Sequence, residues 1–157
     1  MTQNMDDAAK RARMDAFRRI CRERGLRCTV QRRVVLETVL DLNNHPTADD
    51  VYEVVSGRLE GISRTTVYRS LESLARTGVI TKACHPGATA RYDRRTEMHH
   101  HLICLRCDGI VDITEAGLDG LPIPDTSAYG FDVEDYRVQL RGICHDCREK
   151  EKKEETE

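Results

Sequence analysis

The sequence contains no tryptophan and few other aromatic residues, which limits how much surface a single hydrophobic core can bury. Two Phe and five Tyr are spread over 157 residues. Aromatic side chains supply a large share of the buried area in most cores. We therefore expect one domain of ordinary size or two small ones. In the second case, a structural metal ion would compensate for a thin core.

Long apolar segments are lacking as well. No run is long enough to span a bilayer, and the N-terminal residues have none of the apolar character of a signal peptide. We therefore expect a cytoplasmic protein with no membrane partner. In such a reducing compartment, the seven cysteines are expected to bind metal ions as thiolates instead of forming disulfides.

The net charge of −2 conceals two parts of opposite sign. Residues 1–95 contain 18 Lys and Arg against 12 Asp and Glu, a net charge of +6. Residues 96–157 contain 7 against 15, a net charge of −8. The first part would attract a polyanion such as DNA, and the second would repel it.

Apolar residues recur at helical spacing in four segments of the first part. These are residues 10–24, 29–42, 47–59 and 63–78. Thr47 and Asp50 form a capping box at the start of the third segment, and Ser63 and Gly78 mark the two ends of the fourth. The predicted buried faces of the first two helices are formed by Met14, Phe17, Ile20 or Cys21, Val30, Val34, Val35, Leu36, Val39 and Leu40.

The fourth helix has the composition of a recognition helix. Val67, Leu71 and Leu74 share its apolar face. The opposite face has the kinds of side chain that contact DNA when a helix lies in the major groove, although surface helices often carry them without that role. These residues are Arg64, Thr65, Tyr68 and Arg69.

The residues after this helix predict the wing of a winged helix. Residues 79–84 and 88–92 form two strands, and Pro86 and Gly87 suit the turn between them. Basic residues before the recognition helix either contact phosphates or form an ordinary solvated face. These are Lys10, Arg11, Arg13 and Arg27.

From His99 the pattern changes to short strands, predicted at residues 99–104, 109–113 and 137–141. A short helix near Leu118 is limited by Pro122 and Pro124. The charged tail after Arg148 is either a frayed helix or disordered. The expected fold is α+β, with a winged-helix DNA-binding domain at residues 1–92, a hinge at 93–98 and a small metal-binding α/β domain at 99–157.

Two pairs of cysteines have the spacing of a zinc site. Cys104 and Cys107 form one pair, and Cys144 and Cys147 form the other. Four thiolates close a tetrahedral site and leave no open position for catalysis. A redox CxxC motif is the alternative, but it needs only one pair and usually a βαβ setting. The other cysteines lack partners at ligand spacing and are expected to be small buried or half-buried residues: Cys21, Cys28 and Cys84.

Histidines and aspartates predict a second metal site of different chemistry. Alternate side chains of a strand share a face, so His99 and His101 point one way and His100 points the other. Asp93 precedes these histidines, and Asp112 lies on the strand expected to pair with theirs. Nitrogen and oxygen donors without sulfur suit Fe(II) or Mn(II) better than Cu(I). A surface cluster of histidines is the simpler alternative.

Several motifs together resemble the ferric uptake regulator (Fur) family. They are residues 45–52, 65–69, 91–93, 99–112 and 144–147, and the likeness extends from about residue 15 to residue 148. The resemblance implies a homodimeric repressor with an N-terminal winged helix and a C-terminal α/β dimerisation domain. It also implies one structural Zn²⁺ per chain at the four cysteines, and one regulatory Fe²⁺ or Mn²⁺ per chain.

The resemblance further assigns the regulatory ligands, which are His45, Asp93, His99, His101 and Asp112. His45 enters this set only through the resemblance. Zinc-sensing members typically have cysteine in place of Asp93, and iron-sensing members usually have glutamate in place of Asp112. Peroxide-sensing members resemble this chain in having aspartate at both places.

Two further positions bear on the branch of the family. An additional site of iron sensors would use Met98, His100, Asp119 and Tyr136, and Met98 and Tyr136 do not suit it. Arg69, in contrast, resembles the iron sensors at a position that helps to select the operator. We predict a peroxide sensor, with an iron sensor as the alternative.

The predicted mechanism is metal-controlled repression at palindromic, AT-rich double-stranded DNA. The regulatory ion would favour the closed dimer that binds the operator, and oxidation of His45 or His99 by Fe(II) and peroxide would release it. No small-molecule substrate other than peroxide is expected. A non-haem metal enzyme is less expected, since it has no use for the basic first part of the chain. A thiol–disulfide protein is a third class, which tightly held zinc at one per chain and unreactive paired cysteines would exclude.

Overall fold

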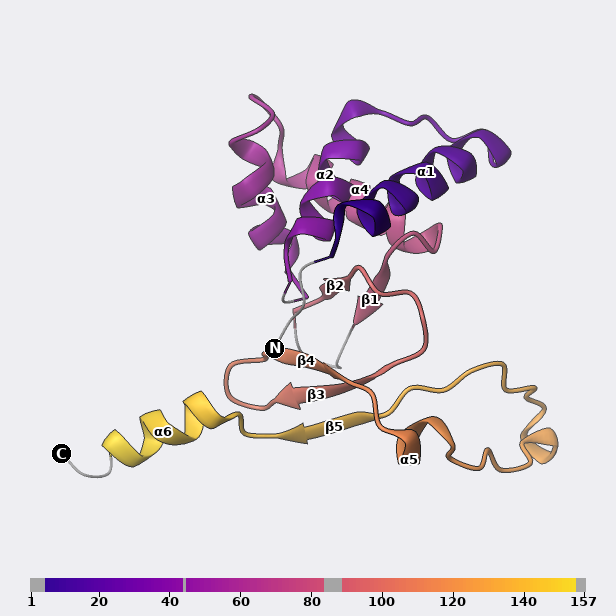
Figure 1. Ribbon diagram of the computed structural model, residues 1–157, viewed down its shortest axis with the longest axis vertical. Coiled ribbons are helices and arrows are strands. Elements are labelled where there is room, and N and C mark those ends of the chain that lie inside the picture. Colours follow the sequence, from indigo (N-terminus) through magenta and orange to yellow (C-terminus); the bar gives the residue numbers. More distant parts are fainter. Residues whose placement is uncertain (1–4, 44, 84–88, 155–157) are drawn as a thin grey trace. The chain divides into compact units, whose positions relative to one another are not determined.

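The computed structural model describes residues 5–43, 45–83 and 89–154. The chain separates into two compact units, Met1–Thr96 and Glu97–Glu157. In the described residues, the first unit has four α-helices and a two-stranded sheet, and the second has a three-stranded sheet with short helices. The elements are labelled in Figure 1. None of the helices in the described ranges has the length and apolar character that crossing a bilayer requires.

Side-chain caps define where each helix of the first unit begins. The helices are α1 (Asp7–Glu23), α2 (Val30–Asp41), α3 (Ala48–Ser56) and α4 (Arg64–Arg76). Asp6, Thr29, Thr47 and Ser63 precede them, and each side chain accepts a hydrogen bond from a backbone N–H of the first turn. The predicted capping box of Thr47 and Asp50 is confirmed. The first helix begins three residues earlier than predicted because Asp6 caps it.

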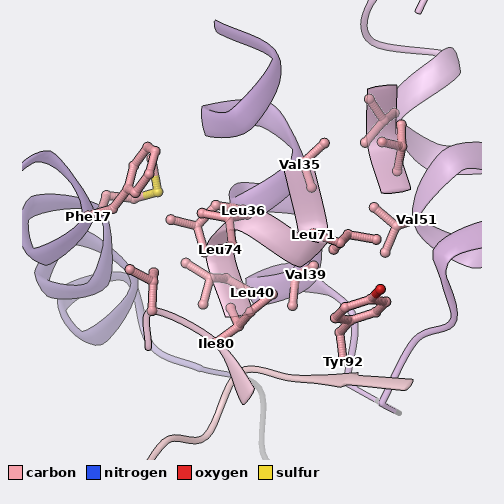
Figure 2. Packing of buried hydrophobic residues seen from close by; sticks show 14 of the residues in the cluster. Phe17, Val35, Leu36, Val39, Leu40, Val51, Leu71, Leu74, Ile80 and Tyr92 are labelled. Atoms are coloured by element: carbon pink, nitrogen blue, oxygen red, sulfur yellow. The ribbon is translucent and has the colours of Figure 1, made fainter. Parts of the chain in front are cut away.

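The core of the first unit is mostly aliphatic and is formed by all four helices together with Val79, Ile80 and Tyr92. Figure 2 shows Phe17 of α1 facing Leu36 and Leu40 of α2, with Leu71 and Leu74 of α4 beside them. Cys21, and not Ile20, completes the buried face of α1. Val30 was wrongly expected in the core, since its side chain is 55% exposed in the first turn of α2.

A short antiparallel hairpin follows α4. Strand β1 (Thr81–Ala83) pairs with β2 (Arg91–Asp93), with Lys82 opposite Tyr92. The first strand begins two residues later than predicted, since Val79 and Ile80 are buried in the helical core and precede β1. The predicted turn at Pro86 and Gly87 lies outside the described residues.

The second unit is built around one central strand. The strands are β3 (His100–Cys104), β4 (Ile110–Ile113) and β5 (Gln139–Gly142), in the order β4-β3-β5. Strand β3 pairs antiparallel with β4 and parallel with β5. The helical elements are α5 (Ala116–Asp119), the 3₁₀ turn η1 (Ser127–Tyr129) and α6 (His145–Glu154). The tail is therefore helical through Glu154, and this helix begins before Cys147.

Glu72 connects α4 to the hairpin, which allows a test of this packing. Lys82 Nζ and Tyr92 Oη each donate to its Oε1 at 2.8 Å. The hydrogen bonds from Lys82 and Tyr92 lower the pKa of Glu72 below its ordinary value of 4.5. The carboxylate therefore stabilises the fold at pH values above 4.5, and this contribution is lost as the pH falls through the lower folded-state pKa.

We expect Glu72→Gln to lower the free energy of unfolding by about 0.5–1 kcal/mol at neutral pH, because the side chain is partly exposed and solvent screens it. Urea denaturation at neutral and acidic pH measures this difference, which should shrink in acid. Glu53→Gln on the exposed side of α3 is the matched control. A difference that stays constant with pH would contradict the role given to the ionised carboxylate.

Candidate metal centres and nucleic-acid interface

Four cysteine sulfurs gather in the second unit. Cys104 ends β3, Cys107 lies in the turn that follows, Cys144 comes after β5, and Cys147 lies in the first turn of α6. The four sulfurs lie within 4.8 Å of one another. The parallel pairing of β3 with β5, which places Cys104 opposite Gly142, brings the two CxxC pairs together.

The four thiols have unequal affinities for a proton. Backbone hydrogen bonds from Cys107, Cys144 and Arg106 lower the pKa of Cys104 to about 6, and the last two amides lie 3.4 Å from its sulfur. The hydrogen bond to Cys144, together with burial and the other two sulfurs, raises the pKa of Cys147 to about 12. The neighbouring sulfurs and burial thus favour the protonated form of Cys147, and a bound dication would favour the thiolate instead. Four sulfur donors in one closed group suit Zn²⁺.

The turn between Cys107 and β4 is shaped to approach the sulfur closely. Asp108 has φ of 53°, a left-handed conformation that aspartate tolerates better than most residues. A Cβ atom at Gly109 would lie only 3.2 Å from the sulfur of Cys107. A glycine directly after a Cys-x-x-Cys-Asp stretch was the available sequence signal for this contact, and the sequence analysis missed it.

A nitrogen and oxygen donor group lies elsewhere in the second unit. His101 is directly opposite Asp112 in the β3–β4 register, so the two side chains share one face of the sheet. His99 Nε2 and His101 Nε2 are each 3.5 Å from Asp112 Oδ1. Both histidines are buried. His99, His101 and Asp112 can therefore offer two imidazole nitrogens and a carboxylate to one cation.

A backbone carbonyl orients the His99 ring for this role. His99 Nδ1 lies 2.7 Å from the carbonyl oxygen of Glu97. Because a carbonyl only accepts hydrogen bonds, the ring proton belongs on Nδ1, which leaves the Nε2 lone pair for a ligand.

His100 has different partners, as the predicted alternation requires. Its Nδ1 accepts a hydrogen bond from Val138 N–H at 3.1 Å, and its Nε2 lies 3.1 Å from Asp119 Oδ1. The Tyr136 ring stacks on it at 5.9 Å between centroids, and the Tyr136 hydroxyl donates to Leu118 O. Both ring nitrogens of His100 thus contact protein groups, which gives this histidine a structural role.

The first unit contains a second nitrogen and oxygen pair. His45 Nε2 and Asp93 Oδ2 are 3.3 Å apart and both side chains are buried. Asp93 Oδ1 accepts a hydrogen bond from Arg95 N–H at 2.7 Å, which directs the other oxygen toward His45. Tyr92 N–H donates to Pro46 O, and Arg91 donates to His45 O, so β2 fixes the backbone on both sides of this pair.

The predicted DNA-contacting residues differ in how freely they can reach a ligand. Thr65, Tyr68 and Arg69 are exposed on α4. Arg64 forms an ion pair with Asp49, and its Cζ lies 4.4 Å from the centre of the Tyr52 ring. The guanidinium is therefore held against α3, a constraint with no local signal in the sequence.

The basic residues before α2 divide in the same way. Lys10 forms an ion pair with Asp41, and Arg13 donates to the Thr96 hydroxyl at 2.6 Å. Arg11 and Arg27 are exposed. Arg11 and Arg27 are thus the better placed of the four for phosphate contacts.

The cysteines without ligand spacing gave a mixed outcome. Cys21 is buried, as predicted. Cys28 is exposed, so its predicted burial is wrong. It lies in the segment between α1 and α2, one residue before the cap of α2, where the core does not extend. Cys84 lies outside the described residues.

The chain has relatives among curated proteins. The model of the Ferric uptake regulator family matches residues 23–141. The Peroxide operon regulator of Bacillus subtilis (strain 168) is 35% identical over 130 residues, which cover 83% of this chain and 90% of that protein. The Peroxide-responsive repressor PerR of Staphylococcus epidermidis (strain ATCC 12228 / FDA PCI 1200) is 31% identical over 128 residues, which cover 82% and 85%.

Solved structures share the fold. The Helicobacter pylori ferric uptake regulator Fur has a TM-score of 0.75 at 18% identity, and the match covers 94% of this chain and 97% of that one. The Ferric uptake regulator from Francisella tularensis with iron has a TM-score of 0.67 at 25% identity, with 79% and 96% covered. The family match and the curated relatives together show that this chain belongs to the ferric uptake regulator family of metal-dependent transcriptional regulators.

Proposed function

We propose that this family member is a peroxide-responsive repressor whose regulatory ion is Fe(II) or Mn(II). The observation that carries the proposal is a donor set without sulfur. It comprises His99, His101 and Asp112 in the second unit and His45 and Asp93 in the first. Imidazole and carboxylate donors suit iron and manganese, whereas the thiolates are grouped at the other site. The curated relatives named as peroxide regulators support the same assignment.

We assign the five residues to one ion that takes ligands from both units. His45 and Asp93 offer only one imidazole and one carboxylate, so they would hold an ion firmly only together with His99, His101 and Asp112. An ion bound by both would restrict the freedom of the DNA-binding unit. A ligand shifts a two-state equilibrium only through its preference for one state, and about 5.5 kcal/mol takes a ratio of 1:99 to 99:1. The His45 and Asp93 bonds would supply that preference, since they form only when the two groups meet.

We further propose that the first unit is a winged helix that reads palindromic, AT-rich operator DNA. Support comes from α4, whose buried face holds Val67, Leu71 and Leu74 in the core while Thr65, Tyr68 and Arg69 are exposed. The following β1–β2 hairpin has the position of a wing. Arg11 and Arg27 would contact phosphates, with a salt-dependent contribution to affinity.

The second unit is proposed to form the dimer. Leu102 of β3 is opposite Val111 of β4 and Leu140 of β5, which produces an apolar row across the sheet. These side chains are 41%, 54% and 43% exposed. Burial of such a row against a second copy would stabilise the dimer by about 25 cal/mol for each Å² of apolar surface removed from water. Two recognition helices related by a twofold axis require a palindromic site.

The same residues define what peroxide would do. Bound Fe(II) would activate peroxide toward a neighbouring imidazole, which gives up the two electrons that reduce it, and Mn(II) would fill the site without that chemistry. His45 and His99 are the predicted targets, each gaining one oxygen atom from hydrogen peroxide while the other oxygen leaves as water. The oxidised ring would no longer bind the ion well. The ion would then no longer restrict the freedom of the DNA-binding unit.

We expect peroxide to add one oxygen atom to His45 or His99 in the iron form and to abolish its operator binding. In the manganese form, the peptides that contain His45 and His99 should keep their masses, and the protein should keep its affinity for DNA. Peptide mass spectrometry and gel shifts on the same samples measure the two effects. Unmodified histidines with intact binding in the iron form would contradict peroxide sensing and favour the iron-sensing alternative.

His45→Ala should remove the link between metal and DNA binding, whichever signal the protein senses. We expect the increase in operator affinity caused by Mn(II) to fall at least about tenfold, or about 1.4 kcal/mol. Gel shifts over a Mn(II) titration measure it. His145→Ala is the control, because His145 is an exposed residue of α6 outside both donor groups. Metal-stimulated binding that survives in His45→Ala would exclude His45 from the regulatory site.

A further inference from the structure

Residues 93–96, which lead out of strand β2, contact α1, α2 and β1 of the first unit. Asp93 ends β2 opposite Thr81 of β1. Its Oδ1 accepts a hydrogen bond from Arg95 N–H at 2.7 Å, and Arg95 O accepts one from the Thr81 hydroxyl at 2.9 Å. The backbone that directs the Asp93 carboxylate is thus itself fixed to β1.

The Arg94 side chain connects this segment to the end of helix α2. Its Nη1 donates to Leu40 O at 3.1 Å, and the contact is partly buried. The last carbonyl groups of a helix have no partner within the helix and carry the negative end of its dipole, so a guanidinium suits this place. Leu40 is 1% exposed and belongs to the core that α4 shares. A displacement of Arg94 would therefore be passed to the packing around α4.

Arg13 makes the same kind of connection to helix α1. Its Nη1 donates to the Thr96 hydroxyl at 2.6 Å, and this contact is also partly buried. Met14, the next residue of the helix, is buried in the core, so the backbone at Arg13 is held in place. Thr96 is half-buried, whereas Glu97 and Met98 are exposed. The contacts with the helices therefore extend to Thr96, and the next two residues are open to solvent.

We propose that Arg13 and Arg94 are positioning residues that transmit metal binding at Asp93 to helices α1 and α2. Residues 93–96 move as part of the DNA-binding unit, and the hinge predicted at residues 93–98 is confined to Glu97 and Met98. The inference rests on the proposed function, which makes Asp93 a ligand of the regulatory ion. Packed side chains and hydrogen bonds with a defined arrangement are what carries coupling between sites. Without the two guanidinium contacts, the ion would fix Asp93 but constrain the helices less.

Two other roles for these residues have different signatures. A phosphate contact, the role predicted for Arg13, adds affinity with or without the regulatory ion, and its contribution falls as salt rises. A residue that only stabilises the fold changes the metal-free and metal-bound affinities together, or neither of them. A residue that transmits metal binding changes only the affinity gained when the ion is added.

The test of transmission uses the full, zinc-loaded chain and operator DNA, with and without Mn(II). Thr96→Val removes the acceptor of the Arg13 hydrogen bond and leaves the charge unchanged. We expect an unchanged metal-free affinity and a Mn(II)-induced increase that is about threefold to tenfold smaller, as expected for one hydrogen bond. Arg94→Ala should reduce the increase in the same way. Arg11→Ala, on the same helix as Arg13, is the control and should lower both affinities by the same factor.

A double-mutant cycle assigns the effect to the contact itself. Arg13→Ala should reduce the Mn(II)-induced increase, and adding Thr96→Val to it should have no further effect, because the same hydrogen bond is lost in both. Additive effects would overturn the role of this contact. A wild-type protein that gains no affinity from Mn(II) would refute the proposed function. A gain that is undiminished in Thr96→Val and Arg94→Ala would refute the inference alone.

Limited proteolysis locates the hinge without the regulatory ion or DNA. Trypsin cleaves after Arg95, and a glutamate-specific protease cleaves after Glu97. Cleavage requires a segment that opens locally. In the zinc-loaded wild type, we expect cleavage after Glu97 and resistance after Arg95. Trypsin should cleave after Arg95 severalfold faster in Thr96→Val and in Arg13→Ala. Equal rates in the wild type and both variants, or a wild type resistant after Glu97, would overturn the inference.

Discussion

The alternation of side chains along strand β3 is the constraint on which the second unit depends. The strand is central in its sheet, so both of its edges are fixed by β4 and β5. One face receives His101, opposite Asp112, and the other receives Leu102, opposite Val111 and Leu140. The strand then ends at Cys104, in the sulfur cluster. A shift of register by one residue would exchange the metal-binding face with the apolar one. The pairing of β3 with β4 and β5 therefore keeps each side chain on its own face.

The two donor groups are separated by chemistry as well as by position. In the sulfur cluster, backbone N–H groups favour the thiolate of Cys104 while neighbouring sulfurs resist further ionisation. A dication that accepts four thiolates relieves that conflict. The other group offers imidazoles, one of them oriented by the Glu97 carbonyl, and a carboxylate. Softer donors at one site and harder ones at the other allow one chain to hold two different ions.

Much of this could be predicted because local patterns decide it. The capping box of Thr47 and Asp50, the apolar face of α4 and the opposite directions of His99 and His100 all follow from helix or strand periodicity. The contacts of Arg64 with Asp49 and Tyr52 could not be predicted, since they depend on how separate helices pack.

Most of the contacts that could not be predicted from the sequence are made by backbone groups. Residue types do not indicate three of these features. They are the amides that donate to the Cys104 sulfur, the carbonyl that orients His99 and the parallel pairing of β3 with β5. Val30 shows the opposite failure, because its spacing fits the apolar face of α2 but its place in the first turn exposes it. Periodicity identifies the face of an element and not how far along it the core extends.

The central claim is that sulfur donors and nitrogen or oxygen donors hold different ions in this chain. X-ray absorption at the zinc and manganese edges of one sample, loaded with both metals, measures the donors of each ion directly. We expect zinc to show a shell of four sulfurs at about 2.3 Å and manganese to show only nitrogen and oxygen neighbours. Sulfur bound to manganese, or a zinc shell of nitrogen and oxygen, would contradict the account.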